Sequence, residues 1–213
     1  MKTPRTNPLL PAMLLLALCF GAVTGLPAAD PPAAPTPRAV VDKAIADALA
    51  ILRDSKLSSD DKRQKINKIA LDNIDFDTMA RLCLGRFYRG LTDAQRAAYT
   101  EAFKTHVINT YRHITDNYND EEVKMIGDRQ ERDNDWTIQT RIVGAKDNKP
   151  GQEVAKVDYR LRSRDNQWKI IDLTIDGVSL VSNFRSQFQE IMNNGGIDKL
   201  LQLLREKNTA NEK

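Results

Sequence analysis

The segment from Val157 to Phe188 constrains the fold more than any other part of the chain. Its first apolar residues alternate with charged ones, which is typical of a half-buried strand, and they are Val157, Tyr159 and Leu161. A polar turn at 164–167 leads to a second strand from Trp168 to Asp176, which Gly177 ends. The apolar spacing then becomes that of one helix face, with Val181, Phe184, Phe188 and Ile191. A hairpin followed by such a helix forms an apolar wall and places no obvious catalytic group.

Residues 1–26 have the layout of a secretory signal peptide. Lys2 and Arg5 supply the positive start, and the apolar run Leu9–Phe20 is too short to span a bilayer. Small residues follow, so we expect cleavage between Thr24 and Ala29. A membrane anchor is the less favoured alternative. We therefore expect an exported, periplasmic protein.

Cys19 and Cys83 are the two cysteines of the chain. Leu18 stands where the signal of a lipoprotein needs a small residue, so a soluble protein is favoured over a lipid-anchored one. Loss of Cys19 with the signal peptide leaves no pair for an internal disulfide. Cys83 lies in an apolar helical pattern, which favours a small core residue over a nucleophile.

The rest of the chain divides into three parts. Residues 27–38 are rich in Pro and Ala and are predicted to be a linker, and residues 208–213 form a polar tail. Residues 39–207 have the length of one domain that can bury a core. The chain has 32 basic and 29 acidic residues, and Lys2 and Arg5 belong to the signal peptide, so no nucleic-acid footprint is indicated.

Helical spacing predicts a helix from Ala39 to about Ser55 and a second one to Asn73, capped by Ser58. A short third helix, capped by Asp75 or Asp77, ends at Gly85. A fourth is predicted from the capping box of Thr92 and Gln95 to about Tyr118. Its aromatic stripe is expected to pack in the core or, less favoured, to line a ligand, and it comprises Tyr99, Phe103, Val107, Tyr111, Ile114 and Tyr118.

Four strands and two closing helices complete the prediction. The first two strands are Val123–Ile126 and the segment around Trp136, Ile138 and Ile142, with a turn at 147–151 before the third. The closing helices are Val178–Met192 and Ile197–Glu206. This order predicts an α+β fold in which a curved antiparallel sheet of about four strands packs against helices on one face and encloses an apolar cavity.

The chain lacks a recognisable catalytic or metal-binding set. His106 and His113 lie seven residues apart on one helix, without further zinc ligands nearby in sequence. Ser179 lacks the second glycine of a nucleophile elbow and is expected to cap the next helix. Nucleotide-binding glycine motifs are absent from the sequence. We therefore predict no enzyme activity, no cofactor and no metal.

Several segments together give the chain a resemblance to the MlaC family, also called the toluene-tolerance family. The matching segments are 76–90 (FDTMARLCLGRFYRG), 91–103, 157–162, 168–188 (WKIIDLTIDGVSLVSNFRSQF) and 195–207 (GGIDKLLQLLREK). The resemblance implies a periplasmic carrier that takes phospholipid between an outer-membrane lipoprotein complex and an inner-membrane ABC transporter with its substrate-binding ring. It also implies a role in outer-membrane lipid asymmetry. A hopanoid or another lipid is an alternative cargo, and we expect a monomer.

Physical chemistry sets the demands on such a carrier. A two-chain lipid has roughly thirty methylene groups, so exposing them to water would cost about 25 kcal/mol. A dry apolar cavity is therefore required. The strand and helix residues predicted to line it are Phe103, Val107, Tyr111, Trp136, Ile138, Ile142, Val157, Tyr159, Leu161, Ile171, Leu173, Val178, Phe184 and Phe188. Which face of the fourth strand points inward stays open, because Ile171, Leu173 and Ile175 alternate against Trp168 and Ile170.

Two other hypotheses stay open at this stage. In one, an exported enzyme uses the cavity as its active site, with His106, His113 or Asp158 as acid or base. In the other, an adaptor protein links envelope complexes and fills its interior with side chains. Four arginines could contact a lipid phosphate or form a solvated docking surface, and they are Arg86, Arg89, Arg160 and Arg185.

Overall fold

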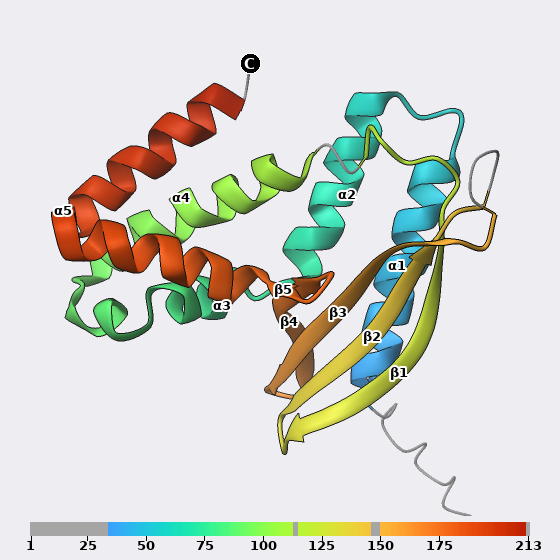
Figure 1. Ribbon diagram of the computed structural model, residues 1–213, viewed down its shortest axis with the longest axis horizontal. Helices are drawn as coiled ribbons and strands as arrows, with labels where there is room; N and C mark the ends of the chain where they lie inside the picture. The colour runs from blue at the N-terminus through green and yellow to red at the C-terminus, as the bar shows by residue number, and fades with distance from the viewer. Residues whose placement is uncertain (1–33, 113–114, 146–149, 212–213) are drawn as a thin grey trace, which may run out of the picture. The chain divides into compact units, whose positions relative to one another are not determined.

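A computed structural model describes residues 34–112, 115–145 and 150–211 (Figure 1). Its helices are α1 (Pro37–Arg53), α2 (Ser59–Asn73), α3 (Phe76–Leu84), the 3₁₀ helix η1 (Gly85–Gly90), α4 (Asp93–Tyr111) and α5 (Leu180–Asn211). Its strands are β1 (Glu122–Arg132), β2 (Asp135–Val143), β3 (Glu153–Arg164), β4 (Gln167–Ile175) and β5 (Val178–Ser179). The predicted signal peptide and most of the predicted linker lie outside the described residues.

The α+β prediction is confirmed. The five strands form one antiparallel sheet in the order β1-β2-β3-β4-β5, so each strand pairs with its neighbour in sequence. The hairpin between β3 and β4 turns at Asp165 and Asn166, which both have positive φ (52° and 58°), as the tight turn of a hairpin requires. Asp176 and Gly177 make the next turn in the same way, with φ of 48° and 84°.

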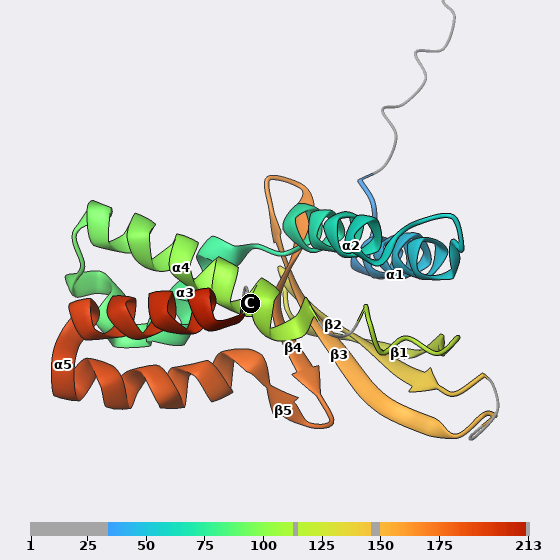
Figure 2. The ribbon, with the colours of Figure 1, turned by 90° about the horizontal axis from the view of Figure 1, so that it is seen from above.

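The helices form two groups. Helices α1 and α2 lie side by side over one face of the sheet, while α3, α4 and α5 gather at its β4–β5 end (Figures 1 and 2). The sequence predicted helices on one face only. The second group packs at the end of the sheet because α3 and α5 contact β4, the last long strand.

Each helix group has its own hydrophobic core. The helical core joins α3, α4 and α5, and it includes Met79, Cys83, Tyr99, Phe103, Phe184, Phe188, Leu200 and Leu204. The sheet core joins α1 to the sheet through Val41, Ile138, Leu161 and Ile170. Ile74 and Leu173 pack against both cores, so they connect the two parts.

An extra residue in β4 explains why its alternation could not be read from the sequence. Leu161 pairs with Ile170, whereas Arg160 pairs with Asp172, so Ile171 has no partner on β3 and forms a bulge. The bulge shifts the alternation by one residue. Trp168 and Ile170 therefore pack toward the sheet core, as Leu173 does.

Helix ends follow local chemistry. Thr36 caps α1, with its hydroxyl accepting from the backbone N–H of Ala39 at 3.2 Å, and proline stands in the first turn. The helix thus begins two residues inside the predicted linker. The predicted caps of Ser58 and Asp75 and the capping box of Thr92 and Gln95 are confirmed.

Three predicted boundaries at helix ends are wrong. Helix α4 ends at Tyr111 and not near Tyr118. Val178 belongs to β5, and Ser179 caps α5, accepting from the N–H of Ser182 at 3.0 Å. The C-terminal helix extends to Asn211 and not only to about Glu206.

The two predicted C-terminal helices are two segments of α5 that meet at a kink. Gly196 has φ 66° and ψ −166°, a region that is open essentially to glycine alone. The second segment folds back along α4, where the side-chain amide of Asn208 donates to the carbonyl oxygen of Ala102 at 3.0 Å. Asn208 is therefore buried and not part of a solvated tail.

Candidate functional site

An apolar pocket of about 440 Å³ lies between α1 and the sheet. Five elements form it: α1, the end of α4 with the loop that follows, and strands β1, β2 and β3. The lining residues are Ile45, Ala48, Leu49, Leu52, Thr110, Tyr111, Asn117, Tyr118, Glu121, Val123, Ile142, Val154 and Tyr159. The lining is mainly aliphatic and aromatic, and Glu121 is its single carboxylate.

Local structure explains the apolar walls. On α1, residues 45, 48, 49 and 52 recur at helical spacing, so they share the face that covers the sheet. On the strands, Val123 pairs with Ile142, so their side chains lie on one face of the sheet. Burial raises the pKa of the phenols of Tyr111 and Tyr159, so both rings stay neutral at physiological pH.

Two arginines fasten the loop between α4 and β1 to the first two helices. The Nε of Arg53, at the end of α1, donates to the hydroxyl of Tyr118 at 3.0 Å. Arg63 on α2 donates from Nε and Nη2 to Oδ1 of Asp116, at 3.1 and 2.9 Å. These contacts hold Tyr118 in the pocket wall.

A larger recess of about 620 Å³ lies on the opposite face of the sheet and is polar. It is lined by Arg129, Glu131, Arg132, Thr137, Asp158, Arg160, Asp172, Thr174, Ser179 and Ser182. Charged groups and hydroxyls of this kind cannot replace water around a hydrocarbon chain without losing their own hydration. The apolar pocket is therefore the better site for an apolar ligand, although it is the smaller of the two.

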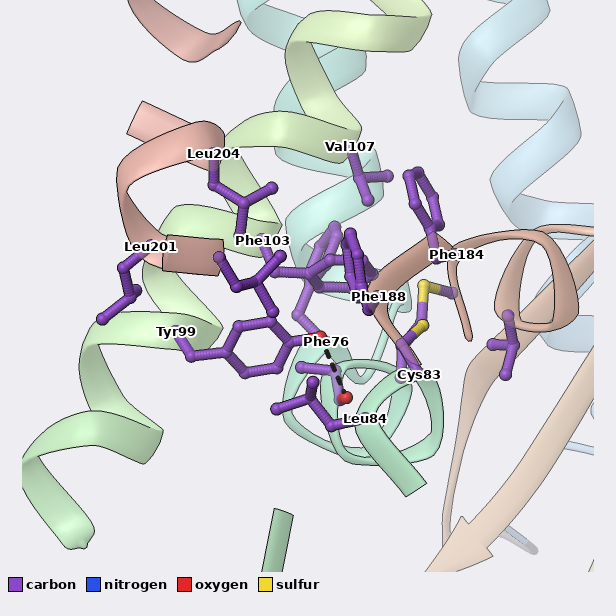
Figure 3. Packing of buried hydrophobic residues seen from close by; sticks show 14 of the residues in the cluster. Phe76, Cys83, Leu84, Tyr99, Phe103, Val107, Phe184, Phe188, Leu201 and Leu204 are labelled. Carbon is purple, nitrogen blue, oxygen red and sulfur yellow. Dashed lines mark hydrogen bonds between the residues drawn. The ribbon is translucent and has the colours of Figure 1, made fainter. Parts of the chain in front are cut away.

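Three of the fourteen residues predicted to bind lipid line the apolar pocket: Tyr111, Ile142 and Tyr159. Four others belong to the helical core, and they are Phe103, Val107, Phe184 and Phe188 (Figure 3). The rings of Phe103 and Phe184 meet edge to face at 5.4 Å, and those of Phe184 and Phe188 stack at 5.5 Å. This part of the aromatic stripe packs helix against helix.

The other seven predicted residues are divided between the sheet and the surface. Ile138 and Leu161 form the sheet core, and Leu173 packs against both cores. Val157 and Ile171 are buried and Trp136 is half-buried, all outside the pocket lining. Val178 is 58% exposed and lies at the surface. Lipid contact by residues outside the pocket lining stays a prediction.

Sequence reasoning missed the helix that forms one whole wall. Ile45, Ala48, Leu49 and Leu52 give α1 an evident apolar stripe, but such a stripe does not show whether it covers a core or a cavity. Val41, on the same stripe, is 1% exposed and packs in the sheet core. The division between core and cavity depends on the distance between helix and sheet, which periodicity does not contain.

None of the four arginines considered for phosphate contact lines the apolar pocket. Arg86 lies over the ring of Phe87, with its guanidinium carbon 5.0 Å from the ring centroid, and Arg160 donates to Asp135. Arg185 donates from Nε to the carbonyl oxygen of Leu82 at 2.9 Å. Arg89 lies in η1, and it is exposed.

The acid or base candidates of the enzyme hypothesis do not meet in the pocket. His106 is buried beside Phe184, with ring centroids 5.7 Å apart, and Asp158 lies in the polar recess. His113 lies outside the described residues. Within the described ranges, no group of three or more His, Cys, Asp or Glu side chains could hold a metal ion. The absence of enzyme activity and of a cofactor stays a prediction.

The described residues contain no helix that is both long and apolar enough to span a membrane. Fold and pocket together define a class of small α+β proteins in which a helix and an antiparallel sheet enclose an apolar pocket.

The chain belongs to the MlaC family, whose model, described as "MlaC protein", matches residues 42–206. It is similar to the intermembrane phospholipid transport system binding protein MlaC of Haemophilus influenzae, with 23% identity over 163 residues, 75% of this chain and 74% of that protein. It is also similar to the solved structure of a phospholipid-binding protein from Ralstonia solanacearum in complex with a phospholipid. That likeness has a TM-score of 0.73 and 25% identity, and it covers 84% of this chain and 100% of the other.

Proposed function

We propose that this protein is a phospholipid carrier that holds an acyl chain in the pocket between α1 and the sheet. The observation that carries the proposal is the apolar lining of an open volume of about 440 Å³. Two similar proteins support it, one a component of an intermembrane phospholipid transport system and the other solved with a phospholipid.

The volume of the pocket suits one acyl chain. A methylene group takes up about as much space as a water molecule in the liquid, so a pocket of about 440 Å³ holds about fifteen of them. At about 0.8 kcal/mol for each methylene removed from water, burying fifteen is worth about 12 kcal/mol. A second chain of the same lipid therefore needs a wider pocket than this one or lies along the surface.

The same surroundings make release possible. The lining offers aliphatic and aromatic carbon to the chain, so a chain in the pocket and a chain in a bilayer have similar free energies. A carrier whose pocket bound the chain much more tightly than the membrane does could not deliver it. The pocket therefore fits a carrier better than it fits a storage protein or a catalyst.

The proposal extends to the setting of this transport. The signal-peptide pattern of residues 1–26 supports export to the periplasm. There the protein would shuttle phospholipid between an outer-membrane lipoprotein complex and an inner-membrane ABC transporter, which would maintain the lipid asymmetry of the outer membrane. A hopanoid cargo is the alternative that analysis of the bound lipid distinguishes.

The test compares lipid loading in two variants of α1. Ala48 lines the pocket, whereas Ala46 is exposed on the same helix. We expect Ala48→Phe to fill the space meant for the chain and to lower the fraction of lipid-loaded protein at least tenfold. The control, Ala46→Phe, should load like the unchanged protein. Native mass spectrometry of protein purified from cells measures the loaded fraction, and lipid extraction identifies the cargo.

Two results would contradict the proposal. The unchanged protein would be found empty and would take up no lipid from vesicles, which would favour the adaptor hypothesis. Alternatively, Ala48→Phe would load as well as Ala46→Phe, which would place the lipid elsewhere.

A further inference from the structure

Three polar side chains of the apolar pocket come from the loop that leads into β1, and they are Asn117, Tyr118 and Glu121. The other polar groups of the lining are the hydroxyls of Thr110, Tyr111 and Tyr159. The hydroxyl of Tyr118 donates to the backbone carbonyl oxygen of Glu121 at 3.3 Å and accepts from Nε of Arg53 at 3.0 Å. Arg53 and Asn117 are exposed, so this side of the pocket faces water. We call Arg53, Tyr118 and Glu121 the polar rim.

Arg53 has capacity for an anion at this rim. Its Nε donates to Tyr118, and within the ranges that the structure describes its Nη1 and Nη2 take part in no hydrogen bond or ion pair. A guanidinium group presents a planar fork of donors that matches the oxygens of a phosphate. A phosphate at the end of an acyl chain in the pocket would thus meet a cation whose position Tyr118 fixes.

The same rim carries negative charge. Glu121 lines the pocket, and its carboxylate accepts from the N–H of Asn119 at 2.7 Å. Asp120 and Glu122 flank it in sequence. The hydrogen bond with Tyr118 and the nearby charges of Asp120 and Glu122 raise the pKa of Arg53. Arg53 therefore lies within electrostatic reach of Asp120 and Glu122, and Glu121 adds a carboxylate to the pocket lining itself.

This pairing of charges distinguishes between lipid headgroups. A zwitterionic headgroup offers its phosphate to Arg53 and its ammonium group to the carboxylates. A headgroup with a net negative charge has the phosphate alone, so the carboxylates repel it without any compensating attraction. Both interactions are exposed to solvent, so the preference is modest and depends on salt.

Resting on the proposed carrier function, we propose that the polar rim of Arg53, Tyr118 and Glu121 selects phospholipids with a zwitterionic, amine-bearing headgroup over anionic ones. We expect a preference of roughly threefold at low ionic strength, in the range that exposed ion pairs provide.

The experiment offers the choice directly. Full-length mature protein, stripped of lipid, is incubated with vesicles of equal parts phosphatidylethanolamine and phosphatidylglycerol with identical acyl chains. Native mass spectrometry then gives the ratio of the two bound lipids. We expect enrichment of the ethanolamine lipid, and a weaker enrichment at 1 M salt, where charges are screened within about 3 Å.

Variants assign the preference to the rim. Glu121→Gln should shift the bound ratio toward the glycerol lipid, and Arg53→Gln should lower loading with both lipids. Arg38→Gln is the matched control, because Arg38 is exposed at the opposite end of the same helix and pairs with Asp128 on β1. This control should leave both the ratio and the loading unchanged. Thermal melting of each variant verifies that it is folded.

The two proposals fail in different ways. Normal loading with a ratio of one in the unchanged protein would overturn the headgroup preference and leave the carrier function intact. A preference that survives in Glu121→Gln would equally overturn the role of the rim. No uptake of either lipid by the unchanged protein would overturn the carrier function and this inference with it.

Discussion

Arg162 binds Asp135 through two parallel hydrogen bonds between neighbouring strands. Its Nε donates to Oδ1 at 2.6 Å and its Nη2 to Oδ2 at 2.7 Å, while Arg160 adds a third contact to Oδ2 at 2.7 Å. The side chain of Asp135 is 4% exposed, whereas both arginines are partly in water. The carboxylate is thus almost fully enclosed by the guanidinium groups of two arginines on β3.

This cluster predicts loss of stability in acid. The hydrogen bond from Arg162 lowers the pKa of Asp135 from 3.8 to about 2, against the opposing effect of burial. Because the folded-state pKa lies below the unfolded one, the stabilisation is complete above pH 3.8 and is lost as pH falls toward 2. The loss should amount to about 2 kcal/mol of unfolding free energy.

Asp135→Asn should remove that part of the acid dependence and cost about 2 kcal/mol at neutral pH. Asp128→Asn is the control, since Asp128 forms an exposed pair with Arg38 at 3.5 Å and should change stability by less than about 0.5 kcal/mol. Denaturant unfolding at pH 7, 4 and 2 measures all three proteins. Identical acid profiles for the unchanged protein and Asp135→Asn would contradict this assignment.

His106 predicts a second, milder pH effect. The histidine is 8% exposed and its Nδ1 has no hydrogen-bond partner in the described chain. Burial is the main cause that lowers its pKa, the charge of Lys207 adds to this, and the neighbouring side chain of Asn208 opposes it. Protonation therefore favours the unfolded chain, and stability falls as pH drops below the unfolded value of about 6.5.

We expect His106→Gln to flatten the stability profile between about pH 6.5 and 5. In the unchanged protein the slope from this group reaches at most about 1.4 kcal/mol per pH unit. Thermal melting in a series of buffers gives the comparison. An equally steep decline in His106→Gln would show that another group causes it.

The kink at Gly196 predicts a stability cost for any side chain there. Its φ of 66° and ψ of −166° lie where residues with a Cβ are strained, so Gly196→Ala should cost about 1–3 kcal/mol. Gly90→Ala is the matched control, because a Cβ at Gly90 meets nothing within 4 Å and its φ is not positive. Denaturant midpoints give the difference. Equal midpoints for the two variants would mean that the kink relaxes without cost.

Leu173 and Val178 predict opposite outcomes for the same chemical change. Leu173 packs against both cores, so Leu173→Asp loses apolar burial and brings an unpaired charge inside, which should cost more than about 3 kcal/mol. Val178 is 58% exposed, so Val178→Asp should stay within about 0.5 kcal/mol. The free energy of unfolding measures both. A large cost at Val178 would indicate that this residue is covered in solution.

Structural features that depend on residues close together in the chain could be predicted from the sequence, whereas features that depend on distant residues could not. Caps at Ser58, Asp75 and Thr92 follow from short-range hydrogen bonds, and all three were predicted. The inward face of β3 followed from alternation. The face of β4 did not, because its bulge at Ile171 depends on pairing with β3.

The pocket itself was the least predictable part. Phe103 and Ile45 have the same apolar character and both lie on helix stripes, yet Phe103 is fully buried while Ile45 lines open space. Their difference lies in what stands opposite: three tightly packed helices for Phe103, and a curved sheet that α1 does not fully meet for Ile45. The spacing of apolar residues in the sequence therefore does not show whether a helix face meets a packed core or an open pocket.

The bulge in β4 also governs how the protein comes apart. Trp168 and Ile170 before it support the sheet core, Ile175 after it supports the helical core, and Leu173 packs against both. Strand β4 thus contributes side chains to both the sheet core and the helical core. Unfolding of either core therefore removes packing contacts that stabilise the other. Heating should therefore melt sheet and helices together, in one cooperative transition with coincident signals from both.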